Sequence, residues 1–237
     1  MAARLALHPR VRPRRPVRSH PPLVESQGKA GHAMTAVAIG ASYATVAQLK
    51  YRLGIPDSDT SKDADLQDKL NSASSDVNLY TGRQFGRDEV VSERTFAPGR
   101  TGVDTHDFWT STGLAIVPYL GQTAGTPWTV AGLELFPTDG IWEQQPGWPF
   151  WRICYGWSMS AFYSASKVKV TAKWGWAAVP TPVITATLLL AAMDNKAGDA
   201  PFGVAGFGDY AVRVKSNPMA EEKLRPYVKD PIKVAGS

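Results

Sequence analysis

Hydrophobic and polar residues alternate strictly in the stretch KVKVTAKWGW at residues 167–176. Valine, alanine and tryptophan occupy the even positions, whereas lysine and threonine occupy the odd positions up to Lys173. A period of two is typical of a strand that buries one face and exposes the other. We therefore expect a half-buried strand from Lys167 to Trp176.

An apolar helix is predicted directly after this strand. Pro180 and Pro182 prevent the strand from continuing, Thr181 is suited to the N-cap, and Pro182 to the first helical position. The segment Val183–Lys196 is apolar on nearly every side. It is shorter than the roughly 20 apolar residues that a bilayer requires. A helix of this kind must be covered on several sides, inside a larger core or between subunits.

Two amphipathic helices are predicted nearer the N-terminus. Thr45 and Gln48 have the spacing of a capping box, and Gly54 and Pro56 end the helix that Thr45 begins. A second helix is expected from about Lys62 to Thr81, because apolar residues recur at spacings of three and four: Leu66, Leu70, Ala73, Val77 and Tyr80.

The opposite side of the second helix is polar. It carries Lys69, Ser72, Asp76 and Arg83. We expect these side chains to lie in water or against a polar partner. Gly82 is expected to follow the last helical residue.

Short segments with strand propensity, separated by turn signals, fill the middle of the chain. All eight tryptophans lie between Trp109 and Trp176. Turns are indicated by PGRTG at 98–102, TDG at 138–140, where Asp139-Gly140 is typical of a hairpin turn, and QPGWP at 145–149. The predicted strands are Val90–Phe96, Gly113–Tyr119, Trp128–Phe136, Phe150–Tyr155 and Lys167–Trp176.

A glycine-rich loop and a last helix are predicted towards the C-terminus. The loop GVAGFG at 203–208 lacks the Lys-Ser/Thr of a P-loop and is interpreted as a structural turn or a subunit contact. Residues 211–214 favour a short extended segment. Asn217 as N-cap and Pro218 at the first position begin a helix that is expected to end near Tyr227.

These elements predict an α+β fold, a small helical bundle of about four helices with an inserted antiparallel β subdomain. The expected divisions are a disordered basic Arg/Pro-rich arm at 1–40, an N-terminal helical part at 41–92, a Trp-rich antiparallel β insert at 93–176, a C-terminal helical part at 177–229 and a flexible tail at 230–237.

Basic residues are concentrated in the arm. Residues 1–33 hold seven of the 26 basic residues and one of the 21 acidic residues, so the rest of the chain has 19 and 20. A nearly neutral body gives no indication of a nucleic-acid surface. Two interpretations of residues 1–33 stay open: a disordered basic arm that touches nucleic acid or an acidic surface, and an over-extended reading frame with the true start at Met34. The second is favoured, because the arm has no core-forming residues.

Few residues suited to metal or redox chemistry occur outside the arm. Cys154 is the one cysteine, which excludes an intramolecular disulfide, and His106 is the one histidine beyond residue 33. Neither a metal site nor a cofactor is expected.

The case for an enzyme is weak. A Ser/His/Asp set would have to use His106. Glu134, Asp139 and Glu143 lie among aromatic residues, as the carboxylates of a glycosidase do, but nearness in sequence says nothing about a pair across a cleft. Cys154 is interpreted as a small buried hydrophobic residue. We expect no catalytic activity.

The chain resembles the head–tail connector (head-completion or adaptor) proteins of long-tailed double-stranded DNA bacteriophages. Four stretches carry the resemblance. They are VAQLKYRLGIPDSD at 46–59 with LQDKLNSASSDVNLYTGRQF at 66–85; VKVTAKWGWAAVPTPVITATLLLAA at 168–192; GVAGFGDYAVRV at 203–214; and MAEEKLRPYVK at 219–229. The Trp-rich middle is longer than in the compact helical members.

The resemblance implies a non-enzymatic structural protein of the virion neck, assembled in the host cytoplasm. It implies a homo-oligomeric ring, usually of twelve copies, that binds the portal protein and a head-closure, stopper or tail-terminator protein. Genomic double-stranded DNA would pass through the lumen without sequence-specific binding, and no membrane is involved. The segment Pro218–Ser237 is expected to reach towards the portal.

Candidate contact residues follow from these expectations. For the subunit and portal interface they are Leu188, Leu189, Met193, Phe202, Phe207, Tyr210, Pro218, Leu224 and Tyr227. For a partner of the β insert they are Trp142, Trp148 and Trp151, less clearly core than Trp174 and Trp176. A second hypothesis is a carbohydrate- or receptor-binding virion module that uses these tryptophans. A third, more distant one is a glycan hydrolase acting through Glu134 or Glu143.

Overall fold

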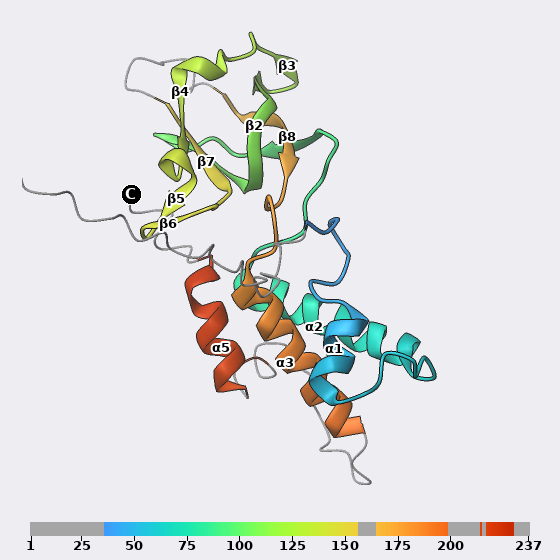
Figure 1. The fold of residues 1–237 in the computed structure, drawn as a ribbon. Helices are drawn as coiled ribbons and strands as arrows, with labels where there is room; N and C mark the ends of the chain where they lie inside the picture. Colours follow the sequence, from blue (N-terminus) through green and yellow to red (C-terminus); the bar gives the residue numbers. More distant parts are fainter. Residues whose placement is uncertain (1–35, 156–164, 199–213, 215–216, 230–237) are drawn as a thin grey trace, which may run out of the picture. The chain divides into compact units, whose positions relative to one another are not determined.

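The computed structural model describes residues 36–155, 165–198, 214 and 217–229. The chain divides into two units, Met1–Ala33 and Met34–Ser237, and all of the described residues belong to the second. They form helices and an antiparallel sheet, so the predicted α+β fold is confirmed (Figure 1). The predicted loop at 203–208 lies outside the described residues, as does the extended segment at 211–214 except for Val214, which is buried.

The two predicted N-terminal helices are present with their caps. Helix α1 spans Val46–Leu53, and the capping box of Thr45 and Gln48 is complete. Helix α2 spans Asp63–Thr81, and Gly82 follows it in the left-handed conformation with φ 66°. Four members of the predicted stripe are fully buried (Leu66, Leu70, Ala73 and Val77), while Tyr80 is half-buried.

On the polar side of α2, two of the residues expected in water or against a polar partner are buried, and Arg83 has the polar partner. Asp76 is 3% exposed and Arg83, two residues beyond the helix, is 8% exposed. The helix is covered on more than its apolar stripe, and Arg83 has a carboxylate partner on a distant strand. Lys69 does remain partly exposed, where it contacts Asp65.

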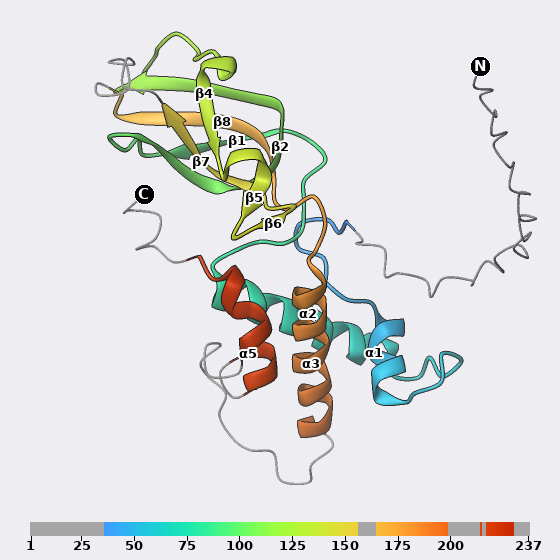
Figure 2. The same ribbon diagram turned by 60° about the vertical axis from the view of Figure 1, so that its left-hand side comes forward.

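The main sheet has the strand order β1-β8-β2-β7-β4, and every pairing in it is antiparallel (Figure 2). Its strands are β1 (Ser92–Phe96), β2 (Gly102–Leu120), β4 (Leu133–Phe136), β7 (Phe150–Tyr155) and β8 (Lys167–Trp174), with β3 (Thr123–Ala124) paired to the end of β2. Alternate residues of β8 are buried along its whole length, as the period of two predicted, but the strand ends at Trp174 and not at Trp176.

Strand β2 is much longer than predicted. It has 19 residues, whereas the sequence indicated only the second half from Gly113. Its first part pairs with β7 and its second part with β8, with shifts in register between Asp104 and Phe108 and between Thr110 and Ala115. These irregularities break the alternation of apolar and polar residues, and this is why the first half carries no strand signal.

The hairpin of the second, small sheet turns at other residues than the predicted Asp139-Gly140. Strands β5 (Ile141–Trp142) and β6 (Gln145–Pro146) form a two-stranded hairpin. Its turn is Glu143-Gln144, with φ of 48° and 64°. Asp139-Gly140 instead belongs to a 3-10 turn, η2 (Thr138–Gly140), that leads into β5. A similar turn, η1 (Val130–Gly132), precedes β4 and shortens the strand predicted from Trp128.

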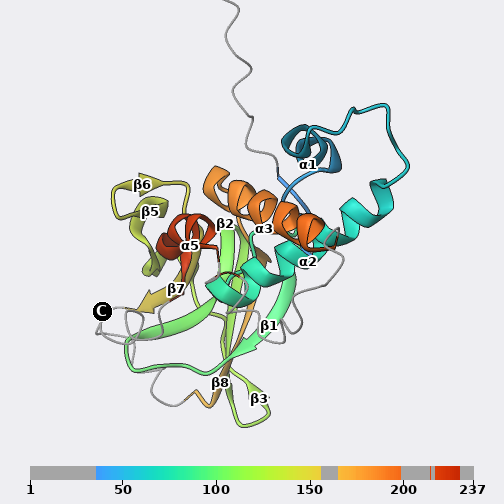
Figure 3. The same cartoon turned by 90° about the horizontal axis from the view of Figure 1, so that it is seen from below.

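Helix α3 (Thr181–Gly198) is the centre of the helical part. It contacts α1, α2 and α5 (Pro218–Leu224), and Figure 3 shows it lying across α2 with α1 and α5 on either side. Thr181 was predicted as the N-cap but is the first helical residue, because the carbonyl of Pro180 accepts the first helical hydrogen bonds from Val183 and Ile184. Asn217 caps α5 as predicted, and the chain continues into a 3-10 turn, η4 (Arg225–Tyr227).

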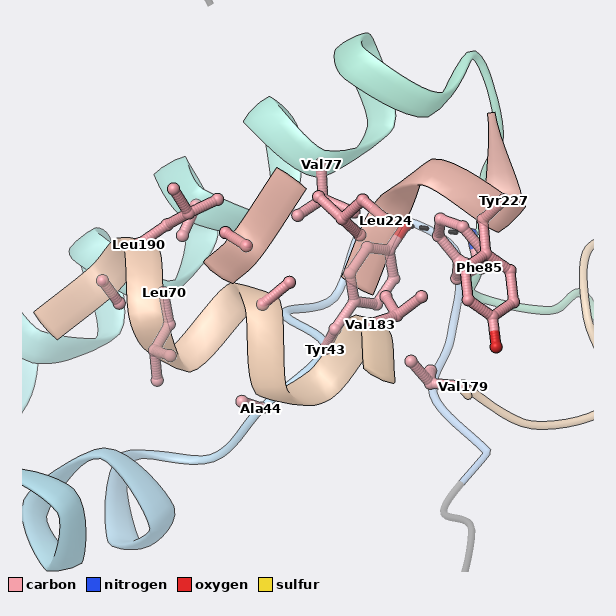
Figure 4. Packing of buried hydrophobic residues seen from close by; sticks show 14 of the residues in the cluster. Tyr43, Ala44, Leu70, Val77, Phe85, Val179, Val183, Leu190, Leu224 and Tyr227 are labelled. Carbon is pink, nitrogen blue, oxygen red and sulfur yellow. Dashed lines mark hydrogen bonds between the residues drawn. The ribbon is translucent and has the colours of Figure 1, made fainter. Parts of the chain in front are cut away.

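Two hydrophobic cores are formed. The helical core joins α1, α2, α3 and α5, with Leu70, Val77, Val183, Leu190 and Leu224 among its buried residues (Figure 4). The sheet core contains the buried side chains of β2, β7 and β8 together with Trp128. Trp148 and Trp151 come from the β region but belong to the helical core. The β region therefore contributes side chains to both cores.

Candidate functional site

The predicted interface residues of α3 lie along one partly exposed side of the helix. Leu188, Leu189 and Met193 are half-buried at the edge of the helical core. By contrast, Leu190 is 2% exposed and Ala191 is 0% exposed. The helix therefore uses one side within the chain and leaves apolar side chains on another side partly open to solvent, as a contact with a second chain requires.

The other predicted interface residues are divided between surface and core. Pro218 is exposed at the start of α5, whereas Leu224 and Tyr227 are 0% and 7% exposed and pack inside the chain. Phe202, Phe207 and Tyr210 lie outside the described residues. Met219, 61% exposed, is an apolar surface residue beside Pro218 that no sequence pattern indicated.

Two of the three tryptophans proposed for a partner contact are buried. Trp148 and Trp151 are 7% and 3% exposed, and the ring of Trp148 stacks on Tyr227 with a centroid distance of 5.4 Å and an interplanar angle of 17°. Trp142 is half-buried and meets Trp151 edge-on. Of these three side chains, only Trp142 offers substantial surface to a partner.

A buried ion pair joins the end of α2 to strand β2. Arg83 Nη1 lies 2.7 Å from Asp107 Oδ1, and both side chains are 5% exposed. The second carboxylate oxygen of Asp107 accepts a hydrogen bond of 2.9 Å from the indole nitrogen of Trp176, and Arg83 Nε donates to the carbonyl of Tyr227. Because both charges are paired and hydrogen-bonded, the cost of burying them is largely offset.

Aromatic rings surround the guanidinium of Arg83. Its central carbon lies 5.4 Å from the ring centroid of Trp148, 4.8 Å from that of Trp151 and 5.9 Å from that of Trp176. Cation–π contacts of this kind gain strength when water is excluded. We name the set Arg83, Asp107, Trp148, Trp151, Trp176 and Tyr227 the junction cluster. It connects the segment after α2, through Arg83, and the segment after α5, through Tyr227, to Asp107 on β2. Nothing in the sequence near Arg83 or Asp107 predicted it.

A cavity of about 350 Å³ lies beside the junction cluster. Its lining includes Arg94, His106 and Lys229 as well as Arg83 and Asp107. The cations are already engaged: Arg94 contacts His106 Nδ1 at 2.9 Å, and Lys229 Nζ donates to the carbonyl of Thr105 at 2.9 Å. Burial lowers the pKa of His106, and the neighbouring charges of Arg94 and Lys229 lower it further. The His106 ring packs edge-on against Phe96 and Trp174.

The groups considered for catalysis are spread over the β region. Glu134 lies on β4 opposite Cys154, Asp139 in η2, and Glu143 in the turn between β5 and β6; all three carboxylates belong to exposed residues. Cys154 is half-buried, and burial raises the pKa of its thiol, which favours the unreactive form.

Within the described residues, no three His, Cys, Asp or Glu side chains gather as a metal ion would require. In the same part of the chain, no helix is long and apolar enough to cross a membrane.

Comparison with known proteins finds similarity only among solved structures. No family model matches the chain, and no curated protein matches it. A chain from the neck of an empty gene transfer agent particle, computed with C6 symmetry, is 17% identical, with a TM-score of 0.46 over 78% of this chain and 89% of that one. A chain from the virion of a native gene transfer agent particle is 22% identical, with a TM-score of 0.46 over 77% and 91%.

Proposed function

We propose that this chain is a non-enzymatic structural subunit of the neck of a phage-like particle, a connector or adaptor that forms a ring beneath the portal. The ring extends the DNA channel and offers the docking platform for head-closure and tail proteins. Its copy number is the twelve that the sequence resemblance implies. The subunit assembles in the host cytoplasm and resides in the virion.

The observation that carries this proposal is the partly open side of α3. The helix is already packed by α1, α2 and α5, yet Leu188, Leu189 and Met193 stay half-buried. A neighbouring subunit that covers these residues would complete the burial of an apolar helix. Identical contacts repeated around a closed ring satisfy every copy in the same way.

The junction cluster supports the same role. Each subunit of a ring must present its contact surfaces at one fixed geometry, because small errors accumulate around the circle. The buried Arg83–Asp107 ion pair and the surrounding rings hold the helical part and the sheet together at several points. A subunit built in this way is suited to a repeated structural role.

The carbohydrate-binding alternative has less support in the structure. A sugar platform needs exposed aromatic faces, but Trp148 and Trp151 are buried in the helical core. Their burial accounts for the aromatic content of this region through packing. No separate observation favours a glycan hydrolase, since Glu134 and Glu143 belong to exposed residues on the sheet edge and in a tight turn.

The test is the mass of the purified protein, alone and mixed with the portal protein of its own particle, by native mass spectrometry and light scattering. A ring-sized multimer, or a multimer that forms on the portal ring, is expected. Leu189→Asp should abolish it while leaving a folded monomer. A wild-type protein that stays monomeric and never joins portal rings would overturn the proposal.

A further inference from the structure

The open face of the main sheet carries a row of lysines on β8. Lys167, Lys169 and Lys173, with Thr171 between the last two, lie on the side opposite to the buried residues of the strand, and each lysine is half-exposed. At about 3.4 Å per residue the row is roughly 20 Å long. The residues between them on the other face are buried, so β8 is polar on one face only.

Two aromatic rings of β2 lie next to the ends of this row. The ring of Tyr119 lies 5.3 Å from Lys167 Nζ and 5.2 Å from Lys169 Nζ. The ring of Trp109 lies 5.4 Å from Lys173 Nζ and 4.9 Å from the guanidinium carbon of Arg87. Attraction to these rings restricts long, flexible side chains, which lowers the entropy lost when they bind an anion.

The cations on this face outnumber the carboxylates that compensate them. Lys169 pairs with Glu93 at 2.7 Å, and Arg87 pairs with Glu89 at 2.5 Å. Lys167 donates to the amide oxygen of Gln122. Neither Lys167 nor Lys173 forms an ion pair with a carboxylate of the described residues. The face therefore keeps two uncompensated positive charges.

Acidic residues are concentrated elsewhere in the chain. Asp57 and Asp59 precede α2 and Asp65 and Asp68 lie in its first turns, and all four are exposed. The nearly neutral balance of the body, 19 basic and 20 acidic residues, is thus an average over separated charges. For this reason the net charge of the body gave no indication of a nucleic-acid surface, although the sheet face is locally basic.

We propose that this basic sheet face, formed by Arg87, Lys167, Lys169 and Lys173 with Tyr119 and Trp109, binds the phosphate backbone of double-stranded DNA without reading its sequence. The choice of DNA among anionic polymers rests on the proposed function, since a neck encloses the genome. Duplex DNA carries a charge about every 1.7 Å of its axis, so a row of this length faces several phosphates. Contacts from lysine to phosphate bind but do not specify a sequence.

The experiment measures binding of the full chain to a fluorescent DNA duplex by anisotropy over a series of salt concentrations. The test variant is the triple Lys167→Gln, Lys169→Gln, Lys173→Gln. The matched control, Lys62→Gln, Lys196→Gln, Lys223→Gln, removes the same charge from the helical part. Residues 1–33 are present in every protein, so their own affinity for DNA is common to all measurements.

The expected result is a flatter dependence of log K on log salt in the test variant, by about 2 to 3 because each lost phosphate contact contributes about 0.9. The control should retain the wild-type slope. Equal slopes in the two variants, or a wild-type protein that does not bind DNA, would overturn the proposal. Equal, lysine-dependent binding to poly-L-glutamate in place of DNA would reassign the face to an acidic protein partner and so overturn it as well.

Two further measurements keep the result interpretable. Thermal unfolding monitors whether the triple variant folds; if it does not, the single variants Lys167→Gln and Lys173→Gln are used, each expected to flatten the slope by about 0.9. Lys→Arg at the same three positions should preserve DNA binding. Association with the portal is measured separately, by mass. A failure of DNA binding therefore leaves the proposed neck function standing, and a failure to join the portal is detected independently of DNA binding.

Discussion

Trp174 and Trp176 are two residues apart in the chain and belong to different hydrophobic cores. Trp174 is 0% exposed in the sheet core, and Trp176 is 2% exposed in the helical core. Gly175 between them has φ 97° and donates its N–H to the carbonyl of Asp107 at 2.7 Å. This glycine lets the chain direct two large side chains into the two cores.

Gly175→Ala is therefore expected to prevent native folding or to destabilise it severely. A Cβ at this position would lie 1.8 Å from the carbonyl oxygen of Gly86, so the backbone of two segments would have to move apart. Gly147 is the matched control: it has φ 88°, but a Cβ there meets nothing within 4 Å. Gly147→Ala should cost only the strain of the left-handed conformation, about 1–2 kcal/mol. Urea unfolding compares the two, and similar losses would contradict the steric explanation.

Asp107→Asn is expected to destabilise the protein by about 3–5 kcal/mol, because it leaves the charge of Arg83 buried without a carboxylate. The control is Glu89→Gln, which removes an exposed carboxylate paired with Arg87 and should cost at most about 1 kcal/mol. Free energies of unfolding from urea titrations decide the result. A small loss for Asp107→Asn would show that the Arg83–Asp107 pair is not part of what holds the junction.

Adjacent leucines of α3 should have separable roles. Leu190 is 2% exposed, so Leu190→Ala should lower the free energy of unfolding by about 2–5 kcal/mol. Leu189 is half-buried, so Leu189→Asp should keep a folded chain and remove the multimer. Circular dichroism and light scattering measure fold and mass on the same samples. A multimer that survives Leu189→Asp would place the subunit contact elsewhere.

Alkaline pH should destabilise the protein through Tyr43. Burial raises the pKa of this phenol above its usual 10.0, and its oxygen accepts a hydrogen bond of 3.0 Å from the amide of Phe85 and donates to Asn78. Above pH 10.0 the unfolded chain loses the phenolic proton while the folded chain keeps it. The protonated phenol of Tyr43 therefore contributes its full stabilisation below pH 10.0. This contribution is lost as the pH rises through the raised pKa that Tyr43 has in the folded protein.

The measurement is urea unfolding between pH 8 and pH 11, values that bracket the usual phenol pKa of about 10. Tyr43→Phe cannot ionise and should show a shallower decline at high pH, although it is less stable at neutral pH. Tyr227 also has a pKa raised by burial and remains in the variant, so part of the decline should persist. Identical slopes for the two proteins would exclude Tyr43 as a source.

Local patterns predicted most of the regular elements. The capping box at Thr45, the left-handed Gly82 and the Asn217 cap occur as expected, because each depends on residues within one turn of helix. Strand β8 follows the alternation of its residues closely. The first half of β2 was not predicted, because bulges interrupt the alternation of its apolar and polar residues. The hairpin turn at Glu143-Gln144 was not predicted either, because it lacks the glycine that usually marks such turns.

The candidate site was only partly predictable. The sequence indicated that α3 needs covering on several sides, and the structure leaves Leu188, Leu189 and Met193 partly open, together with Ile184 and Ala192. It did not distinguish Trp148 and Trp151, which are buried, from a surface pair of tryptophans. Their burial depends on Tyr227 and Arg83, which lie far away in the chain.

The sequence by itself determined the α+β class, the caps at Thr45, Gly82 and Asn217, the alternate burial along β8 and the excess apolar surface of α3. These features depend on periodicity and on neighbours in the chain. Only the tertiary structure decided that Arg83 is buried, that Trp174 and Trp176 enter different cores, and that the lysines of β8 form a basic face beside Tyr119 and Trp109. The burial of Arg83 depends on Asp107, 24 residues away, and the basic face depends on the pairing of β2 with β8. Such long-range contacts leave no local pattern in a single sequence.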